Sequence, residues 1–220
     1  MSEGASGKSI VIAVDGPAAS GKGTLARRLA TYYGFAYLDT GSLYRAVGQA
    51  VRAGGGDPAD KAAALAAANA LDISRIDEQA IRTAEAGEAA SLVAVMPEVR
   101  AAILHFQRDF AARPPGGEPG AVLDGRDIGT VVCPAAQAKL FVTARPEIRA
   151  RRRWLELKNS GSTVTEAQVL DDIVERDRRD AERAASPMKP APDAHLLDTS
   201  DLSIEAAFGA AVAIIDKALG

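Results

Sequence analysis

A glycine-rich loop between a short apolar run and an amphipathic segment constrains this sequence more than any other feature. Ile10–Val14 is an unbroken apolar run, as expected of a strand buried on both faces. The segment 23–33 repeats apolar residues at helical spacing. Between the two, four residues separate Gly16 from Gly21, and Lys22 follows directly. Backbone N–H groups of such a loop, with the helix N-terminus, bind phosphate oxygens.

We expect this loop to bind a nucleoside triphosphate, with Lys22 reaching the β and γ phosphates. The alternative is an ordinary strand-to-helix turn, which the spacing, the lysine and the local context disfavour. Gly23 stands where many such loops carry Ser or Thr, and Thr24 comes next. The sequence contains no Asn-Lys-x-Asp run, which argues against a GTP switch. The predicted ATP-binding residues of the loop are Gly16, Pro17, Ala18, Ala19, Ser20, Gly21, Lys22, Gly23 and Thr24.

Short apolar runs alternate with helix-favouring segments along the rest of the chain. The further runs predicted as strands are 36–38, 121–123, 138–142 and 194–197. The segments predicted as helices are 43–47, 59–70, 97–111, 146–158, 165–185 and the residues after Ser203. Strands separated by helices form βαβ units, so the sequence predicts an α/β fold with a mostly parallel sheet. Ligands of such sheets bind beyond the carboxyl ends of the strands.

Composition excludes several classes of protein. Of the 220 residues, 47% are hydrophobic and 25% charged, as in ordinary globular domains. The formal net charge of −3 disfavours a partner such as polymeric nucleic acid or an anionic membrane surface. Cys133 is the only cysteine, and the sequence contains neither a secretory leader pattern nor an 18-residue apolar run. We therefore expect a cytoplasmic protein that binds anions locally.

Arginines recur at helical spacing in two of the predicted helices. Two helix faces are expected to carry Arg149, Arg152 and Arg153, and Arg176, Arg179, Asp180 and Arg183. Interleaved acidic residues leave a solvated surface as the alternative. Because Arg45 and Arg126 also follow predicted strands, we favour a cage that binds phosphates.

The sequence offers no obvious general base. His105 and His195 each stand alone in an apolar context and are expected to be structural. A kinase that phosphorylates an alcohol needs a base, whereas a monophosphate acceptor, with a second pKa of about 6, arrives as an anion. Positioning and charge neutralisation then suffice. The pattern therefore favours a monophosphate acceptor.

Five stretches spread over nearly the whole chain resemble the bacterial cytidylate kinases, which phosphorylate CMP and dCMP. They are 15–24 (DGPAASGKGT), 38–45 (LDTGSLYR), 123–131 (LDGRDIGTV), 175–183 (ERDRRD with Arg183) and 197–205. The run at 123–131 is the most specific of them. The resemblance implies a three-layer α/β/α P-loop kinase with a nucleotide-binding insert, a mobile lid, and ATP with Mg²⁺ as phosphoryl donor.

The resemblance and the arginine pattern together assign roles to individual residues. The expected catalytic residues are Lys22, Arg126, Arg153 and Arg183, and Arg149 and Arg153 are expected to join the loop in binding ATP. The resemblance implies a CMP site made of Thr40, Arg45, Ser91, Arg100, Arg126, Asp127, Arg176, Asp180 and Arg183. An aspartate can accept from the cytosine N4 amine, which suits Asp127. Asp124 is expected to bind Mg²⁺ through water, and a helix or turn cap is its alternative role.

The resemblance also divides the chain, which we expect to form one monomeric domain over residues 1–220. Its predicted parts are a core (8–53, 96–150 and 190–220), a nucleotide-binding insert (54–95) and a lid (155–185). The insert is short and Ala-rich, so we expect it to be reduced and largely helical. The alternatives left open are a UMP or AMP kinase on the same core, and a P-loop switch protein that binds nucleotide without phosphoryl transfer.

Overall fold

A five-stranded parallel sheet forms the centre of the protein in a computed structural model, which describes residues 9–73, 76–77, 80–81 and 83–220. Residue 8, the first residue of the predicted core, lies outside the described residues. The strands are β1 (Ile10–Asp15), β2 (Ala36–Asp39), β3 (Gly120–Gly125), β4 (Ala138–Thr143) and β5 (His195–Asp198). Their order across the sheet is β2-β3-β1-β4-β5, and every pair is parallel. The predicted α/β fold is confirmed.

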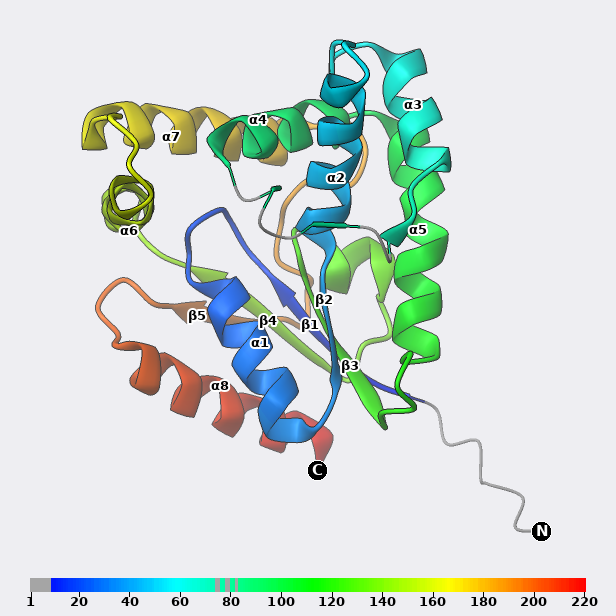
Figure 1. The fold of residues 1–220 in the computed structure, drawn as a ribbon. Helices are drawn as coiled ribbons and strands as arrows, with labels where there is room; N and C mark the ends of the chain where they lie inside the picture. Colours follow the sequence, from blue (N-terminus) through cyan, green and yellow to red (C-terminus); the bar gives the residue numbers. More distant parts are fainter. Residues whose placement is uncertain (1–8, 74–75, 78–79, 82) are drawn as a thin grey trace, which may run out of the picture.

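Helices cover both faces of the sheet (Figure 1). Their bounds are α1 (Lys22–Tyr33), α2 (Thr40–Ala53), α3 (Lys61–Asn69), α4 (Ala84–Val93), α5 (Pro97–Ala112), α6 (Pro146–Asn159), α7 (Glu166–Glu182) and α8 (Ile204–Leu219). Ile12 and Val14 pack against α1 and α8, whereas Ala13 and Leu123 pack against α5. Neighbouring residues of β1 thus point into different layers, which accounts for the unbroken apolar run in the sequence.

Helix α4 lies in a part of the chain where the sequence pattern is weak. It begins because the Thr83 hydroxyl accepts the Ala86 N–H at 3.1 Å, which caps its N-terminus. It packs on α2 where Gly48 faces Ala89, and a Cβ at Gly48 would lie only 2.7 Å from that of Ala89. The small residue therefore permits the close crossing that fixes α4 beside α2.

Helix α7 ends earlier than predicted. The sequence predicts a helix over 165–185, but α7 stops at Glu182 and Arg183 takes an extended conformation with ψ of 136°. Ser186 precedes Pro187, which disfavours helical backbone, and its carbonyl accepts from Arg183 Nε at 2.5 Å. The prediction that Arg183 continues the helical face of Arg176 is therefore wrong.

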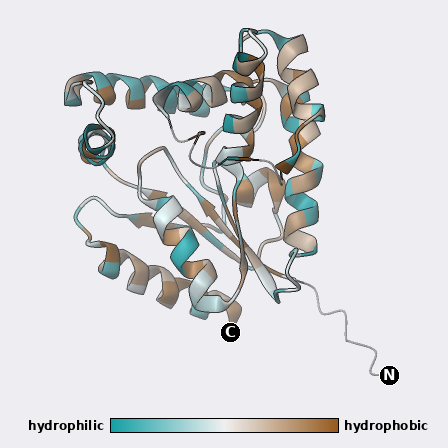
Figure 2. Ribbon diagram, viewed as in Figure 1, coloured by the Kyte–Doolittle hydropathy of each residue, from teal (hydrophilic) through white to brown (hydrophobic). Residues whose placement is uncertain are grey.

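Helices α7 and α8 differ in hydropathy. Figure 2 shows α7 as mostly hydrophilic, whereas α8, packed on the sheet, is hydrophobic along much of its length. Among the described residues no single helix is long and apolar enough to cross a membrane. By length and composition alone, the pair Glu85–Val93 and Pro97–Ala112 passes that test together, with a 100° bend between them.

Candidate nucleotide site

The glycine loop sits at the carboxyl end of β1, where the backbone makes a close approach to β4. Gly16 has φ of 145°, and a Cβ there would lie 1.9 Å from the Val142 carbonyl oxygen. Only glycine fits this position. Gly21 also has positive φ, at 86°, and directly precedes Lys22, the first residue of α1. The loop therefore presents backbone N–H groups and a helix N-terminus in the arrangement that binds anions.

Lys22 and Asp124 form a buried pair beside the loop. Lys22 Nζ lies 3.3 Å from Asp124 Oδ1, and the Tyr37 hydroxyl donates to Asp124 Oδ2 at 3.5 Å. A Cβ at Gly23 would lie 3.1 Å from Asp124 Oδ2, so glycine after the lysine leaves room for this carboxylate. Burial and the nearby Arg126 charge lower the pKa of Lys22, and burial raises the pKa of Asp124.

The environment of Asp124 bears on its two expected roles. Its side chain contacts Lys22 and Tyr37 rather than the backbone N–H groups of a turn, so the cap alternative is wrong. Oδ1 is buried, and its neighbour is the Lys22 ammonium group at 3.3 Å. No group of three His, Cys, Asp or Glu residues that could hold a metal ion occurs in the described part of the chain. Mg²⁺ commonly takes one carboxylate plus phosphates and waters, and Asp124 fits that kind of site.

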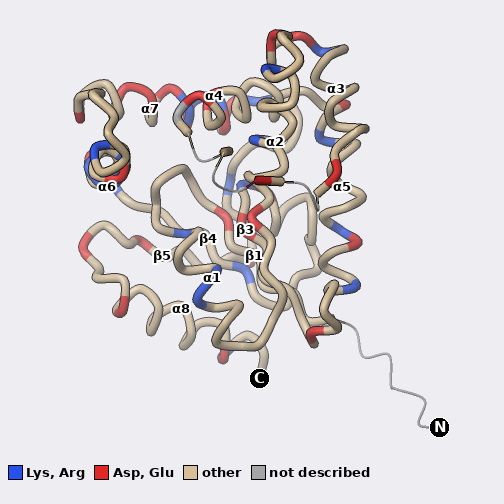
Figure 3. Tube along the Cα trace, viewed as in Figure 1, with Lys and Arg blue, Asp and Glu red and all other residues tan. Residues whose placement is uncertain are grey.

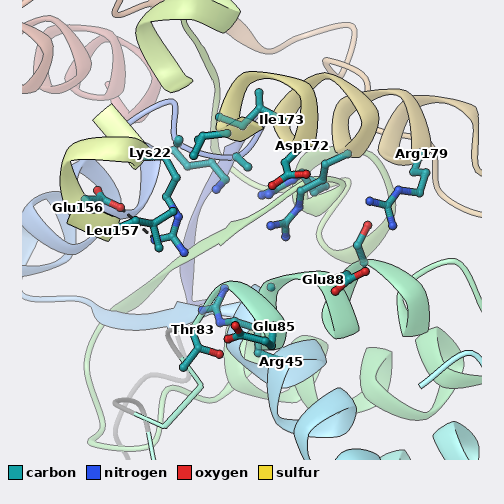
Figure 4. A pocket seen from close by; sticks show the side chains of 18 residues that line it. Lys22, Arg45, Thr83, Glu85, Glu88, Glu156, Leu157, Asp172, Ile173 and Arg179 are labelled. Atoms are coloured by element: carbon teal, nitrogen blue, oxygen red, sulfur yellow. Dashed lines mark hydrogen bonds and ion pairs between the residues drawn. The ribbon is translucent and has the colours of Figure 1, made fainter. Parts of the chain in front are cut away.

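A cavity of about 530 Å³ opens next to Lys22, between α4 and α7 (Figure 4). In Figure 4, Asp172, Ile173 and Arg179 reach it from α7, and Glu85 and Glu88 face them from α4. Its cationic lining residues are Lys22, Arg45, Arg126, Arg153, Arg176 and Arg179. The structure thus brings together arginines from α2, α6, α7 and the end of β3. Figure 3 shows acidic residues close to these cations at the ends of the central strands.

Arg126, Arg176 and Asp180 lie together on one side of this cavity. Arg126 Nε donates to Asp180 Oδ2 at 3.0 Å. Burial, followed by the charges of Arg126 and two further arginines, lowers the pKa of Arg176 to about 10. Its Nε is buried without a partner among the described residues. So many like charges held together favour an anionic ligand that would neutralise them.

Arg45 and Thr40 begin α2 at the end of β2. Arg45 Nη2 donates to Asp39 Oδ2 at 2.5 Å, and the Thr40 hydroxyl donates to the Asp124 carbonyl at 2.7 Å. Although burial acts in the opposite direction, Arg45 and Lys22 hold the pKa of Asp39 below its ordinary value. Arg45 faces the cavity, whereas the Thr40 hydroxyl is engaged with the backbone of β3.

The resemblance assigns cytosine recognition to Ser91, Arg100 and Asp127, which are all buried, and the last two form an ion pair. Arg100 Nη2 donates to Asp127 Oδ2, and Arg183 Nη2 lies 3.7 Å from Asp127 Oδ1. Ser91 lines the cavity, and its buried hydroxyl has no partner among the described residues. Arg100 and Asp127 satisfy each other and do not line the cavity in this conformation. Cytosine recognition by these residues stays a prediction.

Arg149 has protein partners on all sides. Its Nε donates to the Ala144 carbonyl at 2.8 Å, Nη1 to the Ala18 carbonyl at 3.2 Å and Nη2 to Asp177 Oδ2 at 2.6 Å. It therefore links α6 to the glycine loop and to α7. Its predicted contact with ATP is untested, and in this conformation the guanidinium supports the loop. Arg153 instead lines the cavity and donates to Glu156 at 3.1 Å.

A second cavity, also about 530 Å³, lies on the other side of the glycine loop and was not predicted. Lys22 and Thr24 border it together with apolar residues of α6 and of the segment that leads into α8: Leu155, Leu202 and Ile204. Ile204 remains 63% exposed, so the apolar side of the cavity is open to solvent and suited to a flat ring. The loop motif and the stretch 197–205 both border the cavity, but neither indicates from the sequence that an apolar surface forms there. His105 and His195 are exposed and line neither cavity.

The glycine loop, the buried Lys22–Asp124 pair and the arginine-lined cavity agree with the family to which the sequence is similar. The cytidylate kinase family model matches residues 12–217. The chain belongs to the cytidylate kinase family. Relatives named cytidylate kinase from Rhodospirillum rubrum and Caulobacter vibrioides are 61% and 59% identical to it. These alignments cover 94% of this chain and 97% and 96% of the two relatives.

Solved structures add evidence on the fold alone. An uncharacterised protein from Eubacterium ventriosum matches 94% of this chain and 98% of its own length, with a TM-score of 0.53 and 14% identity. Similarity at that level supports the α/β architecture and nothing finer. Membership of the cytidylate kinase family makes the protein an enzyme that transfers phosphoryl groups, and disfavours the switch-protein alternative.

Proposed function

We propose that the protein transfers the γ-phosphoryl group of ATP to CMP and dCMP. The observation that carries this proposal is the arginine-lined cavity directly beside a triphosphate-binding loop. A switch protein needs a site for one nucleotide, whereas these two adjoining anion sites suit a donor and an acceptor. The names of the similar proteins supply the acceptor base.

The donor would bind with its phosphates in the glycine loop and its base on the second cavity. Lys22 at the start of α1 would stabilise charge developing on the β and γ phosphates. Arg153 would act on the same phosphates from α6, and Arg149 would hold the loop in place through the Ala18 carbonyl. Leu155 and Ile204 would contact the donor base through apolar surface.

The acceptor would bind in the first cavity, with its phosphate held by Arg45 and Arg126, which line that cavity, and by Arg183. The phosphate oxygens of the acceptor are already anionic and nucleophilic near neutral pH, so no general base has to remove a proton from them. These arginines then need only to position the phosphate. Asp180 and Arg176 would reach the ribose, and Ser91, Arg100 and Asp127 would recognise cytosine. Arg100 and Asp127 are paired with each other in this conformation. To be recognised, cytosine must therefore either hydrogen-bond to the intact pair or take the place of one partner.

Asp124 is the residue proposed to hold Mg²⁺ through water. When bound, the ion supplies neutralisation of phosphate charge. The burial of the Asp124 carboxylate beside the glycine loop supports this role, and its Oδ1 pairs with Lys22 at 3.3 Å.

We further propose that residues 155–185 act as a lid, that residues 54–95 form a reduced nucleotide-binding insert, and that the enzyme is a cytoplasmic monomer. The position of α7 across the cavity from α4 supports the first two parts (Figure 1). The acidic net charge supports an enzyme without a nucleic-acid or membrane partner.

An ADP-release assay with ATP·Mg²⁺ across CMP, dCMP, UMP and AMP tests the proposed function. We expect the highest catalytic efficiency with CMP or dCMP. A higher catalytic efficiency with UMP or AMP would show that this other monophosphate is the acceptor. ADP release that does not depend on any monophosphate would contradict phosphoryl transfer altogether.

A further inference from the structure

A buried aspartate connects the glycine loop to a turn that directly follows two residues assigned to the acceptor nucleotide. Asp15 is the last residue of β1 and is 4% exposed. Its Oδ1 accepts the Ile128 N–H at 2.7 Å, and its Oδ2 accepts the Gly129 N–H at 2.8 Å. Gly16, the first glycine of the loop, follows it directly.

The two N–H groups belong to the start of a π-helical turn, Ile128–Val132, that follows β3. Arg126 and Asp127 immediately precede this turn. The Asp127 carbonyl accepts the Val131 and Val132 N–H groups, at 2.9 and 3.1 Å. The turn is therefore closed around Asp127 from one side and held by Asp15 from the other.

A buried carboxylate is costly, which indicates that Asp15 is present for its two hydrogen bonds to the turn. Burial of a carboxylate without a cation is costly unless hydrogen-bond donors compensate it. No ion pair to Asp15 occurs among the described residues, and burial raises its pKa to about 7. Gly129 permits the short contact, because a Cβ there would lie 3.1 Å from Lys139 Cδ and 3.4 Å from Asp15 Oδ2. An apolar residue at position 15 would avoid this cost if packing were its only role.

We propose that Asp15 is a positioning residue that fixes Arg126 and Asp127 for binding of the acceptor nucleotide. This inference rests on the proposed function, in which Arg126 contacts the acceptor phosphate and Asp127 the cytosine. Asp15 itself touches neither nucleotide in this assignment. It acts through the backbone of residues 128 and 129.

The substitution Asp15→Asn tests the proposal. An amide keeps the size of the side chain but offers one acceptor oxygen, so one backbone N–H loses its partner and faces an amide N–H. At about pH 8, where the wild-type carboxyl is ionised, we expect KM for CMP to rise about tenfold. We expect KM for ATP to change less than about twofold, and the preference for CMP over UMP to fall, because Asp127 is displaced.

Glu118→Gln is the matched control. Glu118 also accepts a backbone N–H group, from Gly116 at 2.9 Å, but it lies before the amino end of β3, at the end of the sheet opposite the site. It should leave both KM values and the CMP preference unchanged.

Three outcomes would overturn the proposal: Asp15→Asn lowers only the melting temperature, raises both KM values alike, or leaves the CMP preference intact. If Asp15→Asn does not fold, Asp15→Ser, which is smaller and keeps one acceptor, is measured in the same way against the same outcomes. Wild-type enzyme that fails to phosphorylate CMP would instead contradict the proposed function, so the two failures are distinguishable.

Discussion

At the scale of single residues, the candidate site contains buried polar atoms that have no hydrogen-bond partner among the described residues. Buried polar groups in proteins are nearly always hydrogen-bonded, so exceptions call for a ligand or another physical reason. Among the described residues, Ser91 Oγ and Arg176 Nε are such exceptions, and both residues line the first cavity. Both residues are assigned to CMP.

At this scale the first prediction concerns Lys22. Lys22→Ala should lower kcat about a hundredfold or more, because the lysine stabilises charge that develops on the phosphates. Circular dichroism should show the same secondary structure, while the loss of the buried pair with Asp124 should lower the melting temperature. Lys217→Ala is the control, because Lys217 is an exposed lysine of α8 that lines neither cavity. Near wild-type turnover of Lys22→Ala would show that the donor site is elsewhere.

The second prediction concerns the acceptor base. Asp127→Asn should reduce the preference for CMP over UMP by about tenfold, since an amide can accept from N4 or donate to O4. The ratio of kcat/KM values for the two substrates is the measurement, because it does not depend on the fraction of folded enzyme.

The same substitution should also lower stability. It weakens the buried pair with Arg100, and disrupting a buried pair is costly. Asp109→Asn, which changes an exposed pair with Arg113, is the control for a general effect of the substitution. An unchanged CMP to UMP ratio for Asp127→Asn would place base recognition on other residues.

At the scale of elements, the sequence predicts what depends on local periodicity and misses what depends on distant contacts. The run Ile10–Val14 and the loop that follows it are recognisable because glycine, lysine and apolar residues act locally. Asp15 could not be assigned a role, since its partners, Ile128 and Gly129, are more than a hundred residues away. The end of α7 was misplaced because a side-chain bond from Arg183 competes with the helix.

The candidate site follows the same rule. Family motifs assign Arg45, Arg126 and Arg176, and the structure brings all three to one cavity. The apolar donor-base surface could not be predicted, because Leu155 and Ile204 line one cavity only in the folded protein. The pairing of Arg149 with Asp177 was also missed, since the sequence predicts that Arg149 binds ATP.

The third prediction concerns the end of β1 and its dependence on pH. Burial raises the pKa of Asp15 from 3.8 to about 7. Between those values the native state binds this proton more tightly than the unfolded state, so the contribution of Asp15 to stability falls as pH rises through the window. Asp15→Asn has no such proton.

Urea unfolding of the wild type and of Asp15→Asn at several pH values from about 5 to 8 measures this contribution. The free energy of unfolding of the wild type minus that of the variant should decrease steadily as pH rises. A difference that is independent of pH, or that increases, would show that the carboxyl titrates below this window.

For the whole molecule, the distribution of charge matters more than its sum. The net charge is only −3, yet six cationic side chains, two of them from α7, line one cavity. The others come from α1, α2, α6 and the residue after β3, and local acidic partners such as Asp39 and Asp180 hold two of the six. Such an arrangement repels itself without an anion, which favours closure of α7 over the cavity when both nucleotides bind.

The last prediction tests that closure by hydrogen exchange. Exchange across residues 155–185 should slow most when CMP and a non-hydrolysable ATP analogue are both present, and less with either alone. Bound phosphates would neutralise the arginines that line the cavity from α6 and α7, such as Arg153 and Arg176, and closure would exclude water that otherwise hydrolyses ATP. Exchange in this segment that ignores ligand would contradict a lid.

The kinetics of an Arg183 variant test the same closure. Arg183 is buried directly after α7, with Nη2 3.7 Å from Asp127 Oδ1 and Nη1 3.8 Å from Asp180 Oδ1, so it connects the proposed lid to the proposed acceptor site. Arg183→Ala should lower kcat by about tenfold or more with a smaller rise in KM for CMP, because its contact strengthens in the closed transition state. Arg178→Ala is the matched control, since Arg178 lies on the same helix but pairs only with exposed Glu175 and Glu182. An Arg183→Ala enzyme that raises only KM, or that behaves like Arg178→Ala, would mean that the end of α7 binds the acceptor or stabilises the fold without taking part in closure.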